Sequence, residues 1–382
     1  MKPIRQPNDR LELDVSLFRA RLLAWYDAHA RDLPWRESRD PYRVWVSEIM
    51  LQQTRVAAVI EHYHEFLQRF PTVEKLAAAR EASVLAAWSG LGYYRRARML
   101  HAAAKVVVRE LGGRFPVTSE RWRELPGIGR YTAAAVASIA FGEAVAVVDG
   151  NVERVLQRLS GARLSGEHLW DAADELLDRE RPGDFNQAMM ELGATVCTPR
   201  APACLTCPVM ELCATRGELA GAAKTEKQKK REIHYAFHFR NGDGRGGEVF
   251  LVQRARNASL MAGMWELPEI PAGGKAPIQI SGLTAALKRA TQKQIPPPRL
   301  RSGLADRLGR SARNDKGYRP THGLPNPLLF KVRHSITVTD YTVHVWRIDT
   351  PVSGGQWVTK QRLGKVALTG LARKILRKAA II

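Results

Sequence analysis

The chain has 382 residues, and with 45% hydrophobic and 25% charged residues its composition is ordinary for a soluble protein of two or three domains. Lysine and arginine exceed aspartate and glutamate by 21, which indicates a polyanionic partner such as nucleic acid, with an anionic membrane surface as the alternative. No secretory signal opens the chain, and its most apolar segment, residues 131–148, is rich in alanine and broken by Gly142 and Glu143, so we expect no membrane span and a cytoplasmic protein, associated with the nucleoid if the source is bacterial.

Helical periodicity runs through the first part of the chain. From Val15 to about Leu212, apolar residues recur at three- and four-residue spacing, and the runs stop at prolines and glycines. This pattern predicts an all-α domain over residues 1–215. The stretch that follows, residues 216–232, is polar, small and basic, and is typical of a linker.

The remainder of the chain, residues 233–382, has a different pattern of apolar residues. It contains the short β-rich runs EVFLVQ, LLFKVR and YTVHVWRI, one helical stretch over residues 281–292, and a closing helix in LTGLARKILRKA. We therefore predict a smaller α+β domain. Within it, residues 294–327 are rich in proline, arginine and glycine and are expected to form a long basic loop.

A carboxylate stands among apolar residues in the stretch WVSEIMLQQT. Asp40 and Pro41 precede this stretch and predict a helix start, with the aspartate as N-cap and the proline in the first turn. Glu48 would then be buried in a core, where its carboxylate must be hydrogen-bonded or paired with a positive charge, or have its pKa raised by desolvation. Two interpretations are open at this point, a structural carboxylate that caps a neighbouring helix and a catalytic acid.

Residues 119–141 predict a helix, a tight turn and a second helix. Gly127 and Gly129 allow the backbone of the turn to approach a ligand closely, and the N–H groups at the start of the second helix form a site for a phosphate. Helical hairpins often turn on glycine, so this motif alone is a weak signal. Asp149, eighteen residues after Tyr131, follows an apolar run and opens another helix, where the simplest interpretation is an N-cap.

All the cysteines of the chain fall within residues 197–213. They have the spacing C-x6-C-x2-C-x5-C and are Cys197, Cys204, Cys207 and Cys213. In a chain without an export signal, clustered thiols favour metal ligation over disulfides. Zinc and an iron-sulfur cluster both accept thiolate ligands, so the ligand type does not choose between them.

Taken together, these motifs resemble a known family. The chain resembles the helix-hairpin-helix superfamily of base-excision DNA glycosylases, in the branch with a four-iron four-sulfur cluster. Three successive motifs carry this resemblance: LPGIGRYTA, VVDGNVERVLQR, and FNQAMMELGATVC with the cysteines. Within that branch, the chain resembles the MutY-type adenine DNA glycosylases in the stretches RDLPWRESRDPYRVWVSEIMLQQTRV and WSGLGYYRRARML. The resemblance is nearly continuous over residues 17–213 and weaker over residues 233–382. It implies a mainly α fold in which a two-lobed helical glycosylase domain is joined to a smaller α+β, Nudix-like C-terminal domain.

The resemblance gives two carboxylates catalytic roles. Glu48 would be the general acid that protonates the adenine leaving group, and Asp149 the anion that stabilises the sugar cation, since an oxocarbenium-like transition state needs both. The apolar neighbours of Glu48 would keep it protonated, whereas Asp149 would stay ionised and could also serve as an N-cap. Asn151 would orient Asp149 or the attacking water. Tyr131 stands where strand-cleaving relatives carry the lysine that forms a Schiff base, so we expect base removal by water alone.

The resemblance also implies residues that bind DNA and the flipped base. Gln53 and Tyr93 would enter the helix near the mismatch, while Gly127 and Gly129 would bring the hairpin to a phosphate. The adenine pocket would be lined by Arg31, Trp35, Arg36 and Gln187. A tryptophan in an LPW turn is, however, also typical of a core. The cysteines would hold a 4Fe-4S cluster that shapes a basic loop, with Arg200 as one phosphate contact.

The C-terminal part departs from its relatives. In Nudix hydrolases the helix that matches LTAALKRATQKQ carries magnesium-binding glutamates, and this segment has none, so no hydrolase activity is expected. In the family this domain recognises 8-oxoguanine opposite adenine through a Phe-Ser-His turn. Here Ile336, Thr337 and Val338 stand at those positions, and Thr337 keeps the hydroxyl. Glu153 stands where several relatives carry a lysine near the DNA backbone.

These implications describe a monofunctional adenine DNA glycosylase of base excision repair. It would act as a monomer on duplex DNA in which adenine is mispaired with 8-oxoguanine or guanine. An endonuclease III-like pyrimidine glycosylase with lyase action is disfavoured by Tyr131, by Glu48 and by the C-terminal domain. A non-catalytic DNA-binding protein on the same fold is disfavoured because both carboxylates are present.

Overall fold

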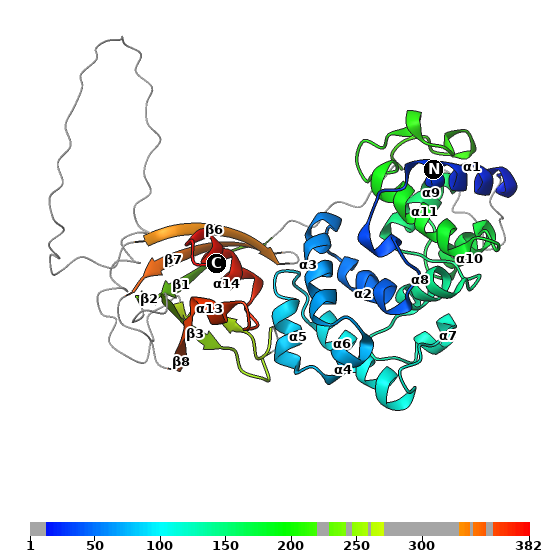
Figure 1. Ribbon diagram of the computed structural model, residues 1–382. Helices are drawn as coiled ribbons and strands as arrows, with labels where there is room; N and C mark the ends of the chain where they lie inside the picture. The colour runs from blue at the N-terminus through cyan, green and yellow to red at the C-terminus, as the bar shows by residue number, and fades with distance from the viewer. Residues whose placement is uncertain are drawn as a thin grey trace, which may run out of the picture. The chain divides into compact units, whose positions relative to one another are not determined.

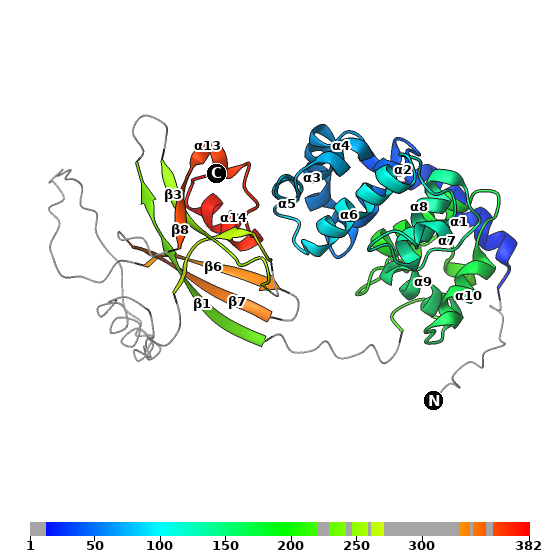
Figure 2. The same ribbon diagram turned by 90° about the horizontal axis from the view of Figure 1, so that it is seen from below.

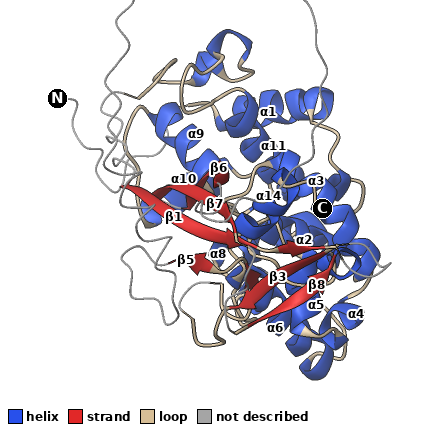
Figure 3. Ribbon diagram, turned by 90° about the vertical axis from the view of Figure 1, so that its left-hand side faces the viewer, coloured by secondary structure: helices blue, strands red, loops and turns tan. Residues whose placement is uncertain are grey.

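The chain forms two compact units in the computed structural model, which describes residues 13–219, 229–241, 247–258, 261–270, 328–336, 339–348 and 354–382. The first unit comprises Met1–Thr225 with Gly364–Gly370, and the second comprises Glu226–Leu363 with Leu371–Ile382. In the described residues all strands, drawn as red arrows in Figure 3, belong to the second unit. The prediction of a helical unit followed by an α+β unit is confirmed.

The first unit is built from helices joined by short loops (Figure 1). They are α1 Val15–His29, α2 Pro41–Leu51, α3 Val56–Arg69, α4 Val73–Ala78, α5 Glu81–Ala87, α6 Arg95–Glu110, α7 Ser119–Trp122, α8 Arg130–Phe141, α9 Gly150–Ser160, α10 Glu167–Leu176 and α11 Pro182–Thr195, with the short 3-10 helices η1 Pro34–Arg36, η2 Cys204–Thr206 and η3 Met210–Leu212. Across the described parts of the chain, no helix has the length and apolar character that crossing a bilayer requires.

The helix α2 begins where its sequence predicts. Asp40 accepts a hydrogen bond from the backbone N–H of Arg43 at 2.8 Å, and Pro41 occupies the first turn. Trp45 then anchors the helix, because its buried ring packs edge-to-face on Trp122 with centroids 5.6 Å apart. The residue in the next turn, Glu48, is thereby carried into the interior.

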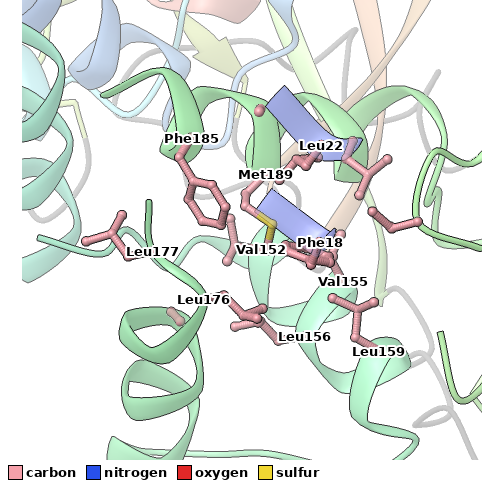
Figure 4. Close-up of a cluster of buried hydrophobic side chains, with 14 of the residues drawn as sticks. Phe18, Leu22, Val152, Val155, Leu156, Leu159, Leu176, Leu177, Phe185 and Met189 are labelled. Atoms are coloured by element: carbon pink, nitrogen blue, oxygen red, sulfur yellow. The ribbon is translucent and has the colours of Figure 1, made fainter. Parts of the chain in front are cut away.

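A separate core joins α1, α9, α10 and α11 (Figure 4). Phe18 of α1 and Phe185 of α11 meet edge-to-face with ring centroids 6.2 Å apart, and Val152 and Leu156 of α9 are buried in the same cluster. Burying a side chain of this size stabilises the fold by about 1.5–3 kcal/mol. The start of α9, which follows Asp149, is therefore held firmly against α11.

The predicted helical hairpin is formed by α7, a tight turn and α8. Gly127 in this turn has a φ of 76°, and a Cβ atom there would lie 2.4 Å from the Cβ of Met99. Only glycine satisfies both conditions. The turn therefore packs directly on α6.

The described residues of the second unit form two sheets (Figure 2). In the first, with the order β5-β1-β7-β6, β1 Lys229–Phe237 runs parallel to β7 Thr339–Arg347 and antiparallel to β5 Glu269–Ile270, while β6 Leu328–Ile336 is antiparallel to β7. In the second, β3 Glu248–Gln253 pairs antiparallel with β2 Phe239–Arg240, β4 Trp265–Glu266 and β8 Gly355–Thr359. The helices α13 Lys360–Leu363 and α14 Gly370–Lys378 follow. The three β-rich runs and the closing helix are confirmed.

One boundary differs from its prediction. The strand β1 begins at Lys229, inside the segment 216–232 that was expected to be linker. Its first residues, Lys229 to Arg231, pair with Thr339 to Tyr341 of β7, so hydrogen bonding to a distant strand outweighs their polar composition. The helix predicted over residues 281–292, the basic loop over 294–327, and Thr337 with Val338 lie outside the described residues.

Candidate active site

A cavity of about 600 Å³ lies among α2, α11 and the starts of α8 and α9. It is lined by Arg31, Leu33, Trp35, Arg36, Glu48, Leu51, Gln52, Gln53, Thr54, Val56, Gly129, Arg130, Tyr131, Thr132, Asp149, Gly150, Asn151, Gln187, Met190, Glu191 and Ala194. The lining includes all four residues predicted to be catalytic and all four predicted for the base pocket. Tyr93 and Gly127 are not part of it, and Thr337 lies outside the described residues.

Glu48 is buried in the wall of this cavity, with 5% of its surface exposed. The hydroxyl of Tyr131 donates a hydrogen bond to its Oε2 at 2.6 Å. Burial raises the pKa of Glu48 to about 7, helped by the nearby negative charge of Asp149 and opposed by the Tyr131 hydrogen bond and the positive charge of Arg36. The carboxyl group therefore exchanges a proton near neutral pH, as a general acid must.

Tyr131 stays a hydrogen-bond donor under the same conditions. Its burial and the adjacent carboxylate of Glu48 raise the pKa of the phenol well above its ordinary value. The hydroxyl also lies 3.6 Å from the sulfur of Met190. The side chain at position 131 thus presents a neutral phenol and no amine.

Asp149 caps the N-terminus of α9. Its Oδ1 accepts hydrogen bonds from the backbone N–H groups of Asn151 at 2.9 Å and Val152 at 2.8 Å, and its Oδ2 accepts one from the Asn151 side chain at 2.9 Å. The positive end of the α9 dipole lies at the same place. The carboxylate is therefore held in one orientation at the cavity wall, so the capping role and a catalytic role are compatible.

Glu191 holds two of the arginines that line the cavity, and this role was not predicted from the sequence. It is buried, with 1% of its surface exposed, and it binds Arg31 at 2.5 and 2.8 Å and Arg36 at 2.8 Å. Burial alone would raise the pKa of Glu191, but the hydrogen bonds and charges of the two arginines outweigh burial and leave that pKa lowered. Its sequence signal was a lone carboxylate in the apolar run AMMELGA, the same signal that identified Glu48.

Trp35 satisfies both interpretations of the LPW turn. It is buried against Tyr63, with the rings edge-to-face and their centroids 5.6 Å apart, and it also lines the cavity. The indole is therefore a core residue whose exposed margin belongs to the pocket.

The two tandem glutamines have different roles in the structure. Gln52 is half-buried and donates a hydrogen bond to the hydroxyl of Thr132 at 3.0 Å, which ties the end of α2 to α8. Gln53 is exposed at the cavity and has a φ of 55°. Tyr93 is also exposed and also has a positive φ, of 46°.

Arg154 connects Asn151 to the cysteine-containing loop and was also missed in the sequence. One of its nitrogens donates to the Asn151 side chain at 2.9 Å, and another donates to the carbonyl of Cys197 at 2.7 Å. It lies about one helical turn after Asp149, where charged residues are common on any solvated helix face. No local pattern distinguishes it from such a residue.

The four cysteines line one small cavity of about 30 Å³. A guanidinium nitrogen of Arg158 lies 3.3 Å from the sulfur of Cys197, and the backbone N–H of Arg216 donates to the sulfur of Cys213 at 3.4 Å. All four cysteines are free of disulfides. Within the described residues, no group of three or more His, Cys, Asp or Glu side chains is arranged to hold a metal ion. Four thiols around one cavity, with N–H donors directed at two of them, nevertheless suit an anionic iron-sulfur cluster.

The fold and this cavity are those expected of a base-excision repair glycosylase. Residues 46–171 match the family described as HhH-GPD superfamily base excision DNA repair protein, which supports that class. Human adenine DNA glycosylase is 36% identical over 432 aligned positions, which cover 95% of this chain and 74% of the human protein. The chain belongs to the adenine DNA glycosylase family.

One further relative agrees with this assignment, and one solved structure agrees with the fold. The adenine DNA glycosylase of Rattus norvegicus is 42% identical over 314 positions, covering 67% of this chain and 61% of the rat protein. Among solved structures, a thermostable thymine-DNA glycosylase superposes with a TM-score of 0.50 at 33% identity, covering 53% of this chain and 96% of the other. The helical fold is therefore shared with glycosylases of another base specificity.

Proposed function

We propose that the protein hydrolyses the N-glycosidic bond of adenine mispaired with 8-oxoguanine or guanine in duplex DNA, and leaves an abasic site without cutting the strand. The observation that carries this proposal is that the buried acid Glu48 and the carboxylate of Asp149 line one cavity. A cavity of about 600 Å³ is within the range of small-molecule sites and accommodates a flipped base. The human and rat relatives named adenine DNA glycosylases support adenine as that base.

The chemistry begins with a proton transfer. Glu48, whose pKa is raised to about 7, gives its proton to a ring nitrogen of adenine, so the base departs as a neutral molecule. Positive charge then develops on the sugar, where the carboxylate of Asp149 stabilises it. Water adds to the sugar carbon, and the proton that it releases returns to Glu48.

Tyr131 restricts the reaction to hydrolysis. A strand-cleaving glycosylase needs an amine that attacks the sugar carbon and forms a Schiff base. The phenol at this position is neutral and engaged with Glu48 at 2.6 Å. Water is therefore the nucleophile, and the product keeps an intact phosphate backbone.

Arg31, Arg36 and Gln187 supply the polar contacts that select the base. Adenine offers ring nitrogens as acceptors and an exocyclic amino group as donor. The two arginines, oriented by Glu191, provide donors, while the amide of Gln187 provides both a donor and an acceptor. For the opposite base, we assign recognition to Thr337 in the second unit, following the resemblance of its turn to the family's lesion-reading turn.

We also infer that Cys197, Cys204, Cys207 and Cys213 hold a 4Fe-4S cluster. Its role when bound would be to fix the loop over residues 197–213, in which Arg200 is exposed for a phosphate contact. Purified protein should be yellow-brown and contain about four irons per chain, as expected for a cubane ligated by four thiolates. A colourless, active protein with stoichiometric zinc would refute the cluster.

A single assay tests the proposed reaction. The full chain is incubated with duplexes that hold adenine opposite 8-oxoguanine, guanine or thymine, and the products are analysed with and without alkali. We expect breaks only after alkali, with the 8-oxoguanine duplex processed fastest and the thymine duplex slowest. Breaks without alkali, or trapping of the wild-type protein by borohydride at the level of a true lyase, would contradict hydrolysis without strand cleavage.

A further inference from the structure

Arg96, the second residue of α6, reaches back to the end of another helix. Its Nη1 donates hydrogen bonds to the backbone carbonyls of Ile49 at 2.8 Å, Met50 at 3.0 Å and Gln52. These carbonyls lie at the C-terminal end of α2, where the last carbonyls have no partner within the helix. Arg96 therefore caps the helix that carries Glu48 and complements the negative end of its dipole.

The second terminal nitrogen of Arg96 binds groups beyond that helix. Nη2 donates to the Thr54 hydroxyl at 3.0 Å and to the backbone carbonyls of Leu91 and Gly92, each at 3.3 Å. The guanidinium also lies over the ring of Tyr93, 5.3 Å from its centroid. One planar side chain thus joins two turns that are separated by α3, α4 and α5 in the sequence.

Each of these turns holds a residue in the left-handed conformation. We call residues 52–54 the glutamine turn, in which Gln53 has a φ of 55°, and residues 91–93 the tyrosine turn, in which Tyr93 has a φ of 46°. Residues other than glycine rarely adopt this conformation, and they keep it only when surrounding contacts impose it. The contacts from Arg96 are of this kind, because they fix carbonyls next to both strained positions.

The geometry of these contacts depends on the guanidinium fork. Arg96 is half-buried, and the hydrogen-bond acceptors named above are all uncharged oxygens. Burial lowers the pKa of Arg96 to about 10, so the group remains charged at neutral pH. A lysine would retain a charge but could not direct donors at both turns from one plane.

We propose that Arg96 is a positioning residue that holds the glutamine turn and the tyrosine turn in fixed positions relative to the end of α2. Entry of Gln53 and Tyr93 into the duplex is thereby coupled to delivery of the base to Glu48. The inference rests on the proposed function, which places these two side chains in the DNA. Arg96 itself need not touch the substrate.

The test is a comparison of Arg96→Gln, Arg96→Lys and a matched control, Arg95→Gln. Arg95 is the exposed neighbour on the same helix, so its variant removes an equal charge without affecting the contacts that Arg96 makes with the two turns. Single-turnover excision at saturating enzyme is measured on the mispair that wild type cuts best, after active-site titration. We expect both Arg96 variants to lose roughly 10- to 100-fold in rate, the cost of a misplacement of about 1 Å, and the control to stay within about twofold.

A second measurement separates positioning from general damage. The Arg96→Gln change is repeated in a background with Gln53→Ala and Tyr93→Ala, and 2-aminopurine beside the target base reports unstacking. If Arg96 acts through the two turns, Arg96→Gln alone should greatly lower the excision rate and reduce unstacking. In the background with Gln53→Ala and Tyr93→Ala, the same change should lower the rate by at most about threefold. An equal loss in both backgrounds, a normal rate for Arg96→Lys, or unchanged unstacking would overturn the inference. A wild-type protein that releases no adenine from any mispair would instead overturn the proposed function.

Discussion

Glu48 and Asp149 are two carboxylates placed in opposite surroundings. Glu48 is enclosed and receives one hydrogen bond, from a phenol, whereas Asp149 receives three N–H donors at the start of a helix. Enclosure favours the neutral acid, and N–H donors stabilise an anion. One residue is therefore suited to give a proton and the other to face a cation.

Replacing Glu48 by glutamine tests the acid directly. The amide keeps the size of the side chain but has no acidic proton, so we expect single-turnover excision to fall by about 10² to 10⁴, the usual contribution of a general acid. Duplex affinity should be retained. The matched control is Glu120→Gln, an exposed glutamate in the first turn of α7, which should leave the rate unchanged. A variant at position 48 that keeps the full rate would remove the acid from the mechanism.

The hydrogen bond from Tyr131 should be visible in the pH profile. Because this bond lowers the pKa of Glu48, its removal in Tyr131→Phe should raise that pKa above about 7. The protonated acid then persists to higher pH, so the alkaline fall in single-turnover rate should move to higher pH. The profile is measured from about pH 5 to about pH 9 beside that of wild type, a range that brackets the expected titration. A shift toward lower pH would mean that the phenol does not stabilise the ionised carboxylate.

At the level of elements, we expect the two glycines of the helical hairpin to affect different properties: Gly127 the stability of the fold, and Gly129 the binding of the duplex. Gly127→Ala would place a Cβ 2.4 Å from Met99 at a φ of 76°, so it should destabilise the fold by about 1–3 kcal/mol. Gly129 has open space around its Cβ position and is the N-cap of α8, so Gly129→Ala should cost less stability than Gly127→Ala but should weaken duplex binding. Chemical denaturation and titration with a labelled duplex measure the two effects. Equal stability losses in both variants would contradict this division.

Local signals predicted the elements well, but not their partners. The start of α2 followed from Asp40 and Pro41, and the hairpin from its glycines, because caps and turns are decided by neighbouring residues. Glu191 and Arg96 act through contacts with residues far away in the sequence, and nothing local marks an arginine whose acceptors are distant carbonyls. The start of β1 at Lys229 was missed for the same reason, since its partner strand lies near the end of the chain.

For the whole molecule, the excess of 21 positive charges predicts strongly salt-dependent binding. If about six phosphates are neutralised, the logarithm of the binding constant should fall with the logarithm of salt concentration at a slope near −5. Arg200→Gln, which removes one exposed candidate contact, should reduce that slope by about one, whereas Arg179→Gln should not, because Arg179 is already paired with Asp174 at 2.7 Å. A slope close to zero would show that the charge serves another purpose.

The parallel pairing of β1 with β7 also affects how the protein is made on the ribosome. The helices from α1 to α11 all precede β1 in the chain, so they can begin to pack on one another before β1 emerges. The strand β1 has to wait for β7, which emerges more than a hundred residues later, with its hydrogen-bonding edge unpaired in the meantime. A nascent chain interrupted before Thr339 would therefore carry the helices α1 to α11, without the segment Gly364–Gly370 of their unit, and an exposed, aggregation-prone strand of the kind that chaperones and proteases recognise.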